Sequence, residues 1–163
     1  PAAIRALVAE LKRMPGVGPR SAERIALWMI QSRDARPGEI ARVIAVRGNI
    51  DERANHMPDV IGLDVLSGDS RALTLLLLHI AVYGAKIRAD AAQLAHERGA
   101  RLIVCGHSHV PFIGKDRGLT VFNPGSIGPR RLHLPIVFGV LEIQEGRLSL
   151  RHIDCETGRE WTP

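Results

Sequence analysis

The chain has 163 residues, of which 45% are hydrophobic and 24% are charged, as is typical of a soluble globular protein. Its two cysteines, Cys105 and Cys155, are far apart, and no apolar run approaches the roughly 20 residues that cross a bilayer. This composition argues against a disulfide framework and a membrane span, and a reducing cytoplasm is the expected location. The net charge of +5 favours anionic partners such as phosphate esters or nucleic acid, or else marks a solvated surface.

Residues 3–31 are predicted to form two short helices with a sharp break between them. Apolar residues recur at helical spacing over residues 3–13 and again over residues 21–29. The intervening Met14-Pro15-Gly16-Val17-Gly18-Pro19-Arg20 cannot continue a helix. This pattern predicts a helix-hairpin-helix in which Gly16 and Gly18 turn backbone N–H groups towards a DNA phosphate and Arg20 adds attraction. The alternative is that the hairpin only packs against the rest of the chain.

Residues 33–42 are polar, contain Pro37-Gly38 and are predicted to be a linker or a remodelled loop. Beyond them, four apolar runs each precede a polar segment. The runs are residues 43–46 before Asn49, 73–78 before His79, 102–105 before His107, and 119–122 before Asn123. In open α/β sheets, ligands bind at the carboxyl edge of the strands, so these polar residues are predicted to converge.

Two further segments complete the predicted body. Residues 89–98 have a helical pattern that stops at Gly99. Residues 136–143 and 147–153 are predicted to form a closing β-hairpin around Glu145-Gly146.

The sharpest local feature is Gly106-His107-Ser108-His109. Two histidines separated by one residue, on a loop that leaves a strand, can reach two adjacent metal ions, and Gly106 lets the backbone approach closely. Imidazole suits Mn, Fe, Zn or Ni. A lone histidine at a strand end, such as His79, is as often plain polar surface, but the set with Asn49 is far more specific than its members.

Residues 43–155 resemble the calcineurin-like metallophosphoesterase superfamily, in particular its small bacterial phosphodiesterase branch. The matching motifs are residues 46–51, the leucine-rich run into His79, residues 106–111, and residues 123–126 followed by Pro129-Arg130. The resemblance implies that Asn49, His79 and His107 hold metal two and that His109 holds metal one, with Asn49 and His107 as catalytic residues. It also implies a divalent metal cofactor, with manganese first and nickel, iron or zinc as alternatives.

In that superfamily, two ions clamp a phosphoryl oxygen and activate a water for in-line attack. Many relatives place a histidine after the motif asparagine as the leaving-group acid, whereas this chain has Ile50 and then Asp51. No acid is assigned here.

The superfamily pattern begins with Asp-x-His, which this chain lacks before Asn49, so two ligands of metal one have no counterpart. Asp34 is a candidate for the bridging aspartate, and the alternative is a solvated linker residue. Two ions are therefore expected only if the site is complete, and activity is expected to be weakened. In the superfamily these motifs lie on strands of the sheet. Without those strands a sheet edge would be exposed, which favours a homo-oligomer.

Residues 3–31 resemble the helix-hairpin-helix of the RecR recombination mediator family, which implies non-specific DNA contact through residues 14–24. The fold class is thus predicted to be α/β, an α+β sandwich of truncated metallophosphoesterase type, preceded by an α-helical hairpin. The expected domains are residues 1–32, a linker over 33–42, and 43–163. The leading function is metal-dependent hydrolysis of a phosphodiester or phosphomonoester. The alternatives are a DNA-binding hairpin on an inactive body, or a recombined chain without a settled function.

Overall fold

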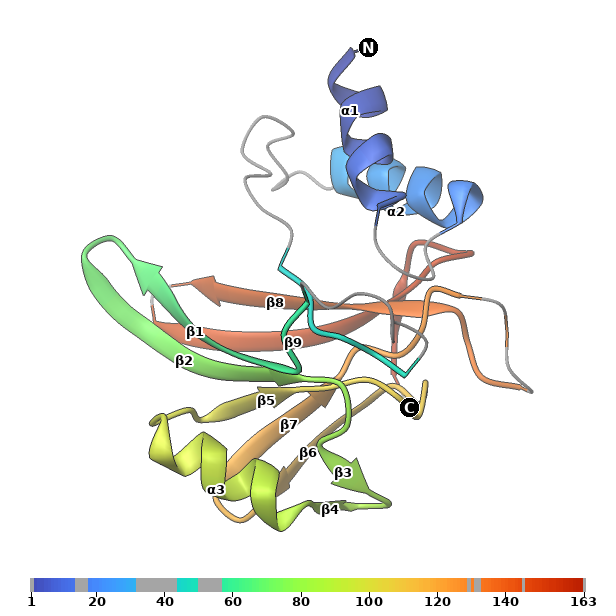
Figure 1. Ribbon diagram of the computed structural model, residues 1–163. Helices are drawn as coiled ribbons and strands as arrows, with labels where there is room; N and C mark the ends of the chain where they lie inside the picture. The colour runs from blue at the N-terminus through green and yellow to red at the C-terminus, as the bar shows by residue number, and fades with distance from the viewer. Residues whose placement is uncertain are drawn as a thin grey trace.

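The structure is a computed structural model that describes residues 2–13, 18–31, 44–49, 57–128, 130, 133–144 and 146–162 (Figure 1). The helices in these ranges are α1 (Ala2–Leu11), α2 (Pro19–Gln31) and α3 (Ala89–Glu97). The strands are β1 (Val60–Ser67), β2 (Ser70–Leu78), β3 (Val82–Tyr83), β4 (Lys86–Ile87), β5 (Leu102–Val104), β6 (Phe112–Asp116), β7 (Leu119–Asn123), β8 (Val137–Gln144), β9 (Arg147–Asp154) and β10 (Glu160–Trp161). None of the described helices is long and apolar enough to cross a bilayer.

Within the described ranges the main sheet has five strands in the order β1-β2-β5-β7-β6. Strands β2, β5 and β7 run parallel, whereas β1 and β6 pair antiparallel at the two edges. A second sheet has the order β10-β9-β8 and contains the predicted closing hairpin, with Val137 opposite Asp154 and Gln144 opposite Arg147. The predicted α/β fold with an N-terminal helical segment is therefore confirmed.

The core has two apolar layers, one on each face of the main sheet. On one face, Leu76, Ile103 and Val121 pack with the alanines of α3. On the other face, Leu75, Leu102 and Phe122 pack against residues of β8 and β9. Because neighbouring residues of a strand point to opposite faces, both layers draw on the same three short strands. This double burial explains why those strands appear in the sequence as uninterrupted apolar runs.

Helix α3 covers the face of the main sheet that lies away from β8 and β9 (Figure 1). It ends as predicted, because Arg98 is its C-cap and Gly99 follows with a φ of 65°. A glycine in this left-handed conformation ends helices at little cost, since it has no Cβ to clash.

The predicted N-terminal helices are also present, on the side of the second sheet (Figure 1). Helix α2 begins with Pro19, whose fixed φ suits the first turn and whose missing N–H would be unsatisfied there anyway. Buried Leu7 of α1 and buried Ala22 and Ala26 of α2 provide apolar surface for the hairpin. The linker predicted over residues 33–42 lies outside the described residues, so its boundaries stay a prediction.

The buried strand predicted over residues 43–46 is wrong for the part that the structure describes. Residues 44–48 have no regular strand structure, and Ile44 is 39% exposed. A strand forms only where a neighbouring strand satisfies its N–H and C=O groups, and here the Arg47 N–H donates to the carbonyl of Pro58, in a loop, at 2.9 Å. The apolar run alone was therefore not enough to predict a strand.

The packing between the two sheets generates a prediction about Gly139 of β8. A Cβ added there would lie 2.3 Å from Cζ of Phe122 and 2.7 Å from Cβ of Pro124. We expect Gly139→Ala to lower the free energy of unfolding by about 1–3 kcal/mol, because neither neighbour can move without disturbing the core. Urea denaturation measures this change.

Gly114→Ala in β6 is the matched control, since the nearest atom to its added Cβ is 3.7 Å away. That change should stay within about 1 kcal/mol of the parent. Equal destabilisation by the two substitutions would contradict close packing at Gly139.

Candidate metal centre

The candidate site lies at the carboxyl edge of the three parallel strands. His79 directly follows β2, the histidine loop (residues 106–109) follows β5, and Asn123 is the last residue of β7. Parallel neighbours bring their carboxyl ends to one edge, so the sheet itself gathers these residues.

The structure brings Asn49, His79 and His107 together. Nε2 of His79 lies 3.3 Å from Nδ1 of His107, and Nδ2 of Asn49 lies 3.3 Å from the same Nδ1. The two imidazole rings meet edge-on, with centroids 5.1 Å apart and planes at 82°. These three residues, called the ligand trio below, come from three separate segments of the chain.

The two imidazole nitrogens of the trio have a spacing that fits a shared ion. Two nitrogens that each sit about 2.1 Å from a tetrahedral metal are roughly 3.4 Å apart, which is close to the observed spacing. The same spacing also suits an N–H···N hydrogen bond in the metal-free protein. The amide of Asn49 can supply its oxygen to a metal by rotation about its last side-chain bond.

None of the three residues of the trio is a carboxylate. Among the described residues there is no group of three or more His, Cys, Asp or Glu side chains that could hold a metal. Asp34, the tentative bridging ligand, lies outside the described residues. His109 lies half-buried in the histidine loop, and the two contacts above involve only the trio. The roles of all five residues as ligands stay predictions.

The histidine loop has an unusual backbone. His107 and His109 have φ values of 67° and 62°, and in the described ranges only Arg117 shares this feature among non-glycine residues. Left-handed conformations are uncommon for residues with a Cβ and persist only where the surroundings fix them. The fold therefore holds the two histidines in place against a backbone preference.

Asn123 provides much of this restraint, although the sequence pattern gave it no role. Its side chain is fully buried, and its amide donates to the carbonyl of Gly106 at 2.9 Å and to the hydroxyl of Ser108 at 3.0 Å. Its side-chain oxygen accepts from the Gly125 N–H at 3.0 Å. Asn123 thus joins the histidine loop, at Gly106 and Ser108, to the turn that follows β7, at Gly125. The sequence signal for this role was the place of Asn123 in the motif of residues 123–126.

The second sheet also holds Asn123. Buried His152 of β9 donates through Nε2 to the carbonyl oxygen of Asn123 at 2.7 Å. Trp161 packs edge-on against His152, and Phe122 lies on another side of it. Because a carbonyl only accepts, this bond fixes the proton of His152 on Nε2.

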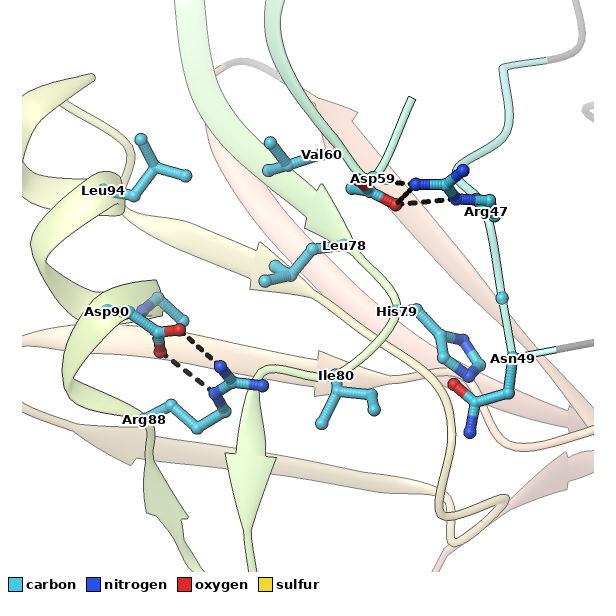
Figure 2. A pocket seen from close by; sticks show the side chains of 12 residues that line it. Arg47, Asn49, Asp59, Val60, Leu78, His79, Ile80, Arg88, Asp90 and Leu94 are labelled. Atoms are coloured by element: carbon cyan, nitrogen blue, oxygen red, sulfur yellow. Dashed lines mark hydrogen bonds and ion pairs between the residues drawn. The ribbon is translucent and has the colours of Figure 1, made fainter. Parts of the chain in front are cut away.

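A cleft of about 840 Å³ opens beside the trio, with Asn49 and His79 in its wall (Figure 2). Arg47 and Arg88 also line it, and each is paired with a carboxylate. Asp59 accepts from Arg47 at 2.6–2.8 Å, and Asp90 accepts from Arg88 through both oxygens. The hydrogen bond from Arg88 holds the pKa of the Asp90 carboxyl below its usual value, so this pair is charged at neutral pH.

Neither cysteine is a candidate nucleophile. Burial raises the pKa of the Cys105 thiol to about 11 and that of the Cys155 thiol to about 11. Both groups are therefore protonated near neutral pH, whereas nucleophilic cysteine chemistry needs the thiolate.

The residues predicted for DNA contact are described only in part. Gly16 is outside the described residues, while Gly18 and Arg20 are exposed at the start of α2. The next residue, Ser21, donates its hydroxyl to the carbonyl of Ile127 at 2.9 Å. This bond ties α2 to the body, so the hairpin has a packing role whatever else it binds.

The family model for the calcineurin-like phosphoesterase superfamily domain matches residues 32–146, which is more than half of the chain. The chain belongs to this superfamily. The matched range includes the trio, the histidine loop and Asp34. A probable metallophosphoesterase of Methanocaldococcus jannaschii is 29% identical over 93 residues, which is 54% of this chain and 43% of that protein. The chain thus spans less than half the length of this phosphoesterase relative.

Solved structures show the same phosphoesterase fold at low sequence identity. A predicted phosphoesterase from Streptococcus pneumoniae has a TM-score of 0.54 and 21% identity, covering 68% of this chain and 62% of that chain. Vps29 of Entamoeba histolytica in complex with Zn²⁺ has a TM-score of 0.54 and 20% identity, covering 73% and 66%. These similarities support the fold alone.

The N-terminal part has a separate resemblance. The family model for the RecR helix-hairpin-helix matches residues 4–46. The recombination protein RecR of Paracoccus denitrificans is 41% identical over 51 residues, which is 31% of this chain and 24% of that protein. The predicted resemblance of both parts of the chain is therefore confirmed.

The restraint on the histidine loop generates a prediction about Asn123. Asn123→Ala leaves the Gly106 carbonyl and the Gly125 N–H without their partner, so we expect the free energy of unfolding to fall by about 2 kcal/mol or more. Denaturation in urea with a chelator measures this loss without any contribution from metal.

Asn49→Ala is the control, because Asn49 is exposed. Its effect on the metal-free protein should remain within about 0.5 kcal/mol. A harmless Asn123→Ala change would rule out the buried amide as the support of the loop.

Proposed function

We propose that this chain is a metal-dependent phosphoesterase whose reaction centre is the ligand trio with His109. The observation that carries the proposal is the approach of Asn49, His79 and His107 to 3.3 Å at the carboxyl edge of the sheet. Membership of the phosphoesterase superfamily supports the same class of chemistry.

In this proposal the three residues of the trio supply the ligand atoms. His79 and His107 offer imidazole nitrogens from the segments that follow two neighbouring strands, and Asn49 offers an amide oxygen without adding charge. A Cβ built at Gly106 would lie 3.9 Å from Nδ1 of His79, which is an ordinary contact, so the start of the histidine loop lies beside the ring of His79. His109 would present a fourth donor from the other end of the loop.

The trio with His109 would hold a divalent ion, which would supply Lewis-acid chemistry for a phosphoryl oxygen and would lower the pKa of a water. Manganese is the first candidate, with nickel, iron or zinc as alternatives that suit imidazole. The Zn²⁺ complex of the Entamoeba histolytica Vps29 supports the view that this fold accepts such an ion.

The ligand count bears on the strength of the site. The trio with His109 contributes no carboxylate, and the chain contains no Asp-x-His. We therefore expect the 163-residue chain to bind one ion per molecule more tightly than a second one. A phosphodiester or phosphomonoester is the proposed substrate, since the site leaves both open.

The first test of this function is hydrolysis of bis(p-nitrophenyl) phosphate with Mn²⁺. The double variant His107→Ala, His109→Ala should lose at least about 100-fold in kcat/KM, because it removes two of the proposed ligands. Chelation of the metal should lower kcat/KM of the parent protein by at least the same factor.

His96→Ala is the matched control for the double variant. His96 is exposed in the last turn of α3, so the loss of its imidazole should leave kcat/KM within about twofold. Indistinguishable rates for the parent and the double variant would refute catalysis at the trio.

The superfamily match does not favour the alternative of a DNA-binding hairpin on an inactive body. DNA contact through residues 14–24 stays a separate prediction, supported by the RecR-like match and by the exposure of Arg20. Arg20→Ala should weaken binding to a 30-nucleotide single strand and make the salt dependence shallower by about one ion. Fluorescence anisotropy at several salt concentrations measures both effects.

Lys115→Ala is the control, because it removes one positive charge from an exposed position on β6. Equal weakening by the two changes would assign DNA affinity to net charge and not to the hairpin.

A further inference from the structure

We propose that the cleft beside the ligand trio binds an uncharged, largely apolar organic group of the phosphate ester, of aryl or nucleoside-base size. This inference rests on the proposed function, because it assigns the part of the substrate that lies next to the phosphoryl group.

The cleft is continuous with the trio. Asn49 and His79 belong to both, and from them the cleft extends past Leu78 to the start of α3 (Figure 2). A phosphoryl group held by the trio would therefore direct a substituent along this wall. The volume of about 840 Å³ lies within the range of small-molecule sites, so the space exceeds what a phosphate alone needs.

The charges of the cleft cancel. Its described lining contains two arginines and two aspartates, joined as the pairs Arg47–Asp59 and Arg88–Asp90. Each guanidinium already donates two groups to its carboxylate. A second anionic group of a substrate would have to compete with these carboxylates. The pairs therefore disfavour a second phosphate or a carboxylate of the substrate in the cleft.

The floor of the cleft is apolar. Val60, Leu78 and Leu94 are half-buried, and each packs against the core layer under α3 while also lining the cleft. Their outer surfaces are thus fixed from beneath and open to a ligand. Covering such surface is favourable by about 25 cal/mol for each Å² removed from water, which suits a ring more than a methyl group.

The face of Arg88 is already engaged. Its guanidinium carbon lies 5.4 Å from the ring centroid of Tyr83, which is itself 70% exposed. Arg88 thus contacts both this ring and Asp90 while it lines the cleft.

Three simple phosphonates test the proposal by isothermal titration calorimetry on the full chain with Mn²⁺. Methylphosphonate offers the phosphoryl group alone, phenylphosphonate adds an apolar ring, and 3-phosphonopropionate adds a second anion. We expect phenylphosphonate to bind about tenfold tighter than methylphosphonate. We expect 3-phosphonopropionate to bind no tighter than methylphosphonate.

A cleft variant checks where the ring binds. Leu94→Gln keeps the size of the side chain and removes its apolar character, so the preference for phenylphosphonate should fall to about threefold or less. The affinity for methylphosphonate should not change. Leu148→Gln is the matched control on β9, at a residue that is 39% exposed and does not line this cleft, and it should keep the full preference.

The outcomes separate the two proposals. Equal affinities for methylphosphonate and phenylphosphonate, or tightest binding of 3-phosphonopropionate, would overturn the apolar cleft and leave the phosphoesterase proposal standing. If Leu94→Gln kept the full preference for phenylphosphonate, the ring would bind outside the cleft, and the proposal of an apolar cleft would also be overturned. Absence of binding by all three phosphonates would overturn the phosphoryl site and this inference with it.

Discussion

Parallel pairing of β2, β5 and β7 is the constraint on which the site depends. Residues 79, 107 and 123 are far apart in the sequence, and only the shared direction of the three strands brings them to one edge. The pairing in turn requires both faces of the strands to be buried, since Leu75 and Leu76, or Leu102 and Ile103, point to opposite layers. The chemistry at the edge thus depends on the apolar layer between the sheet and α3 and on the layer between the sheet and β8 and β9.

Asn123 links that packing to the histidine loop. Its amide donates to Gly106 and Ser108 within the loop, and its own carbonyl accepts from His152 of the second sheet. A buried amide with its partners satisfied specifies one arrangement, because any alternative would leave polar groups unpaired in the core. The positive φ of His107 and His109 is the strain that this arrangement sustains.

The hairpin and the phosphoesterase body meet in space as well as in sequence. The RecR-like match covers residues 4–46 and the phosphoesterase match covers residues 32–146, so both include residues 32–46. The bond from Ser21 to Ile127 lies just beyond the Asn123 motif, which places α2 against the segment that follows β7. Helix α2 is therefore attached to the body through the segment that follows β7.

The sequence by itself determined the elements that are buried on both faces and the residues that follow them. The runs that became β2, β5 and β7, the glycine end of α3 and the hairpin of β8 and β9 were all readable, because hydrophobic periodicity and turn residues are local signals. Strands β1 and β6 at the sheet edges were missed, since they alternate half-buried and exposed residues, with Asp64 and Lys115 at exposed positions, and so contain no uninterrupted apolar run. Only the tertiary structure decided that residues 44–48 form no strand, that Asn123 supports the loop, and that paired arginines line a cleft. Each of these depends on which distant backbone or side-chain group is within hydrogen-bonding reach, and a sequence read along its length carries no measure of that distance.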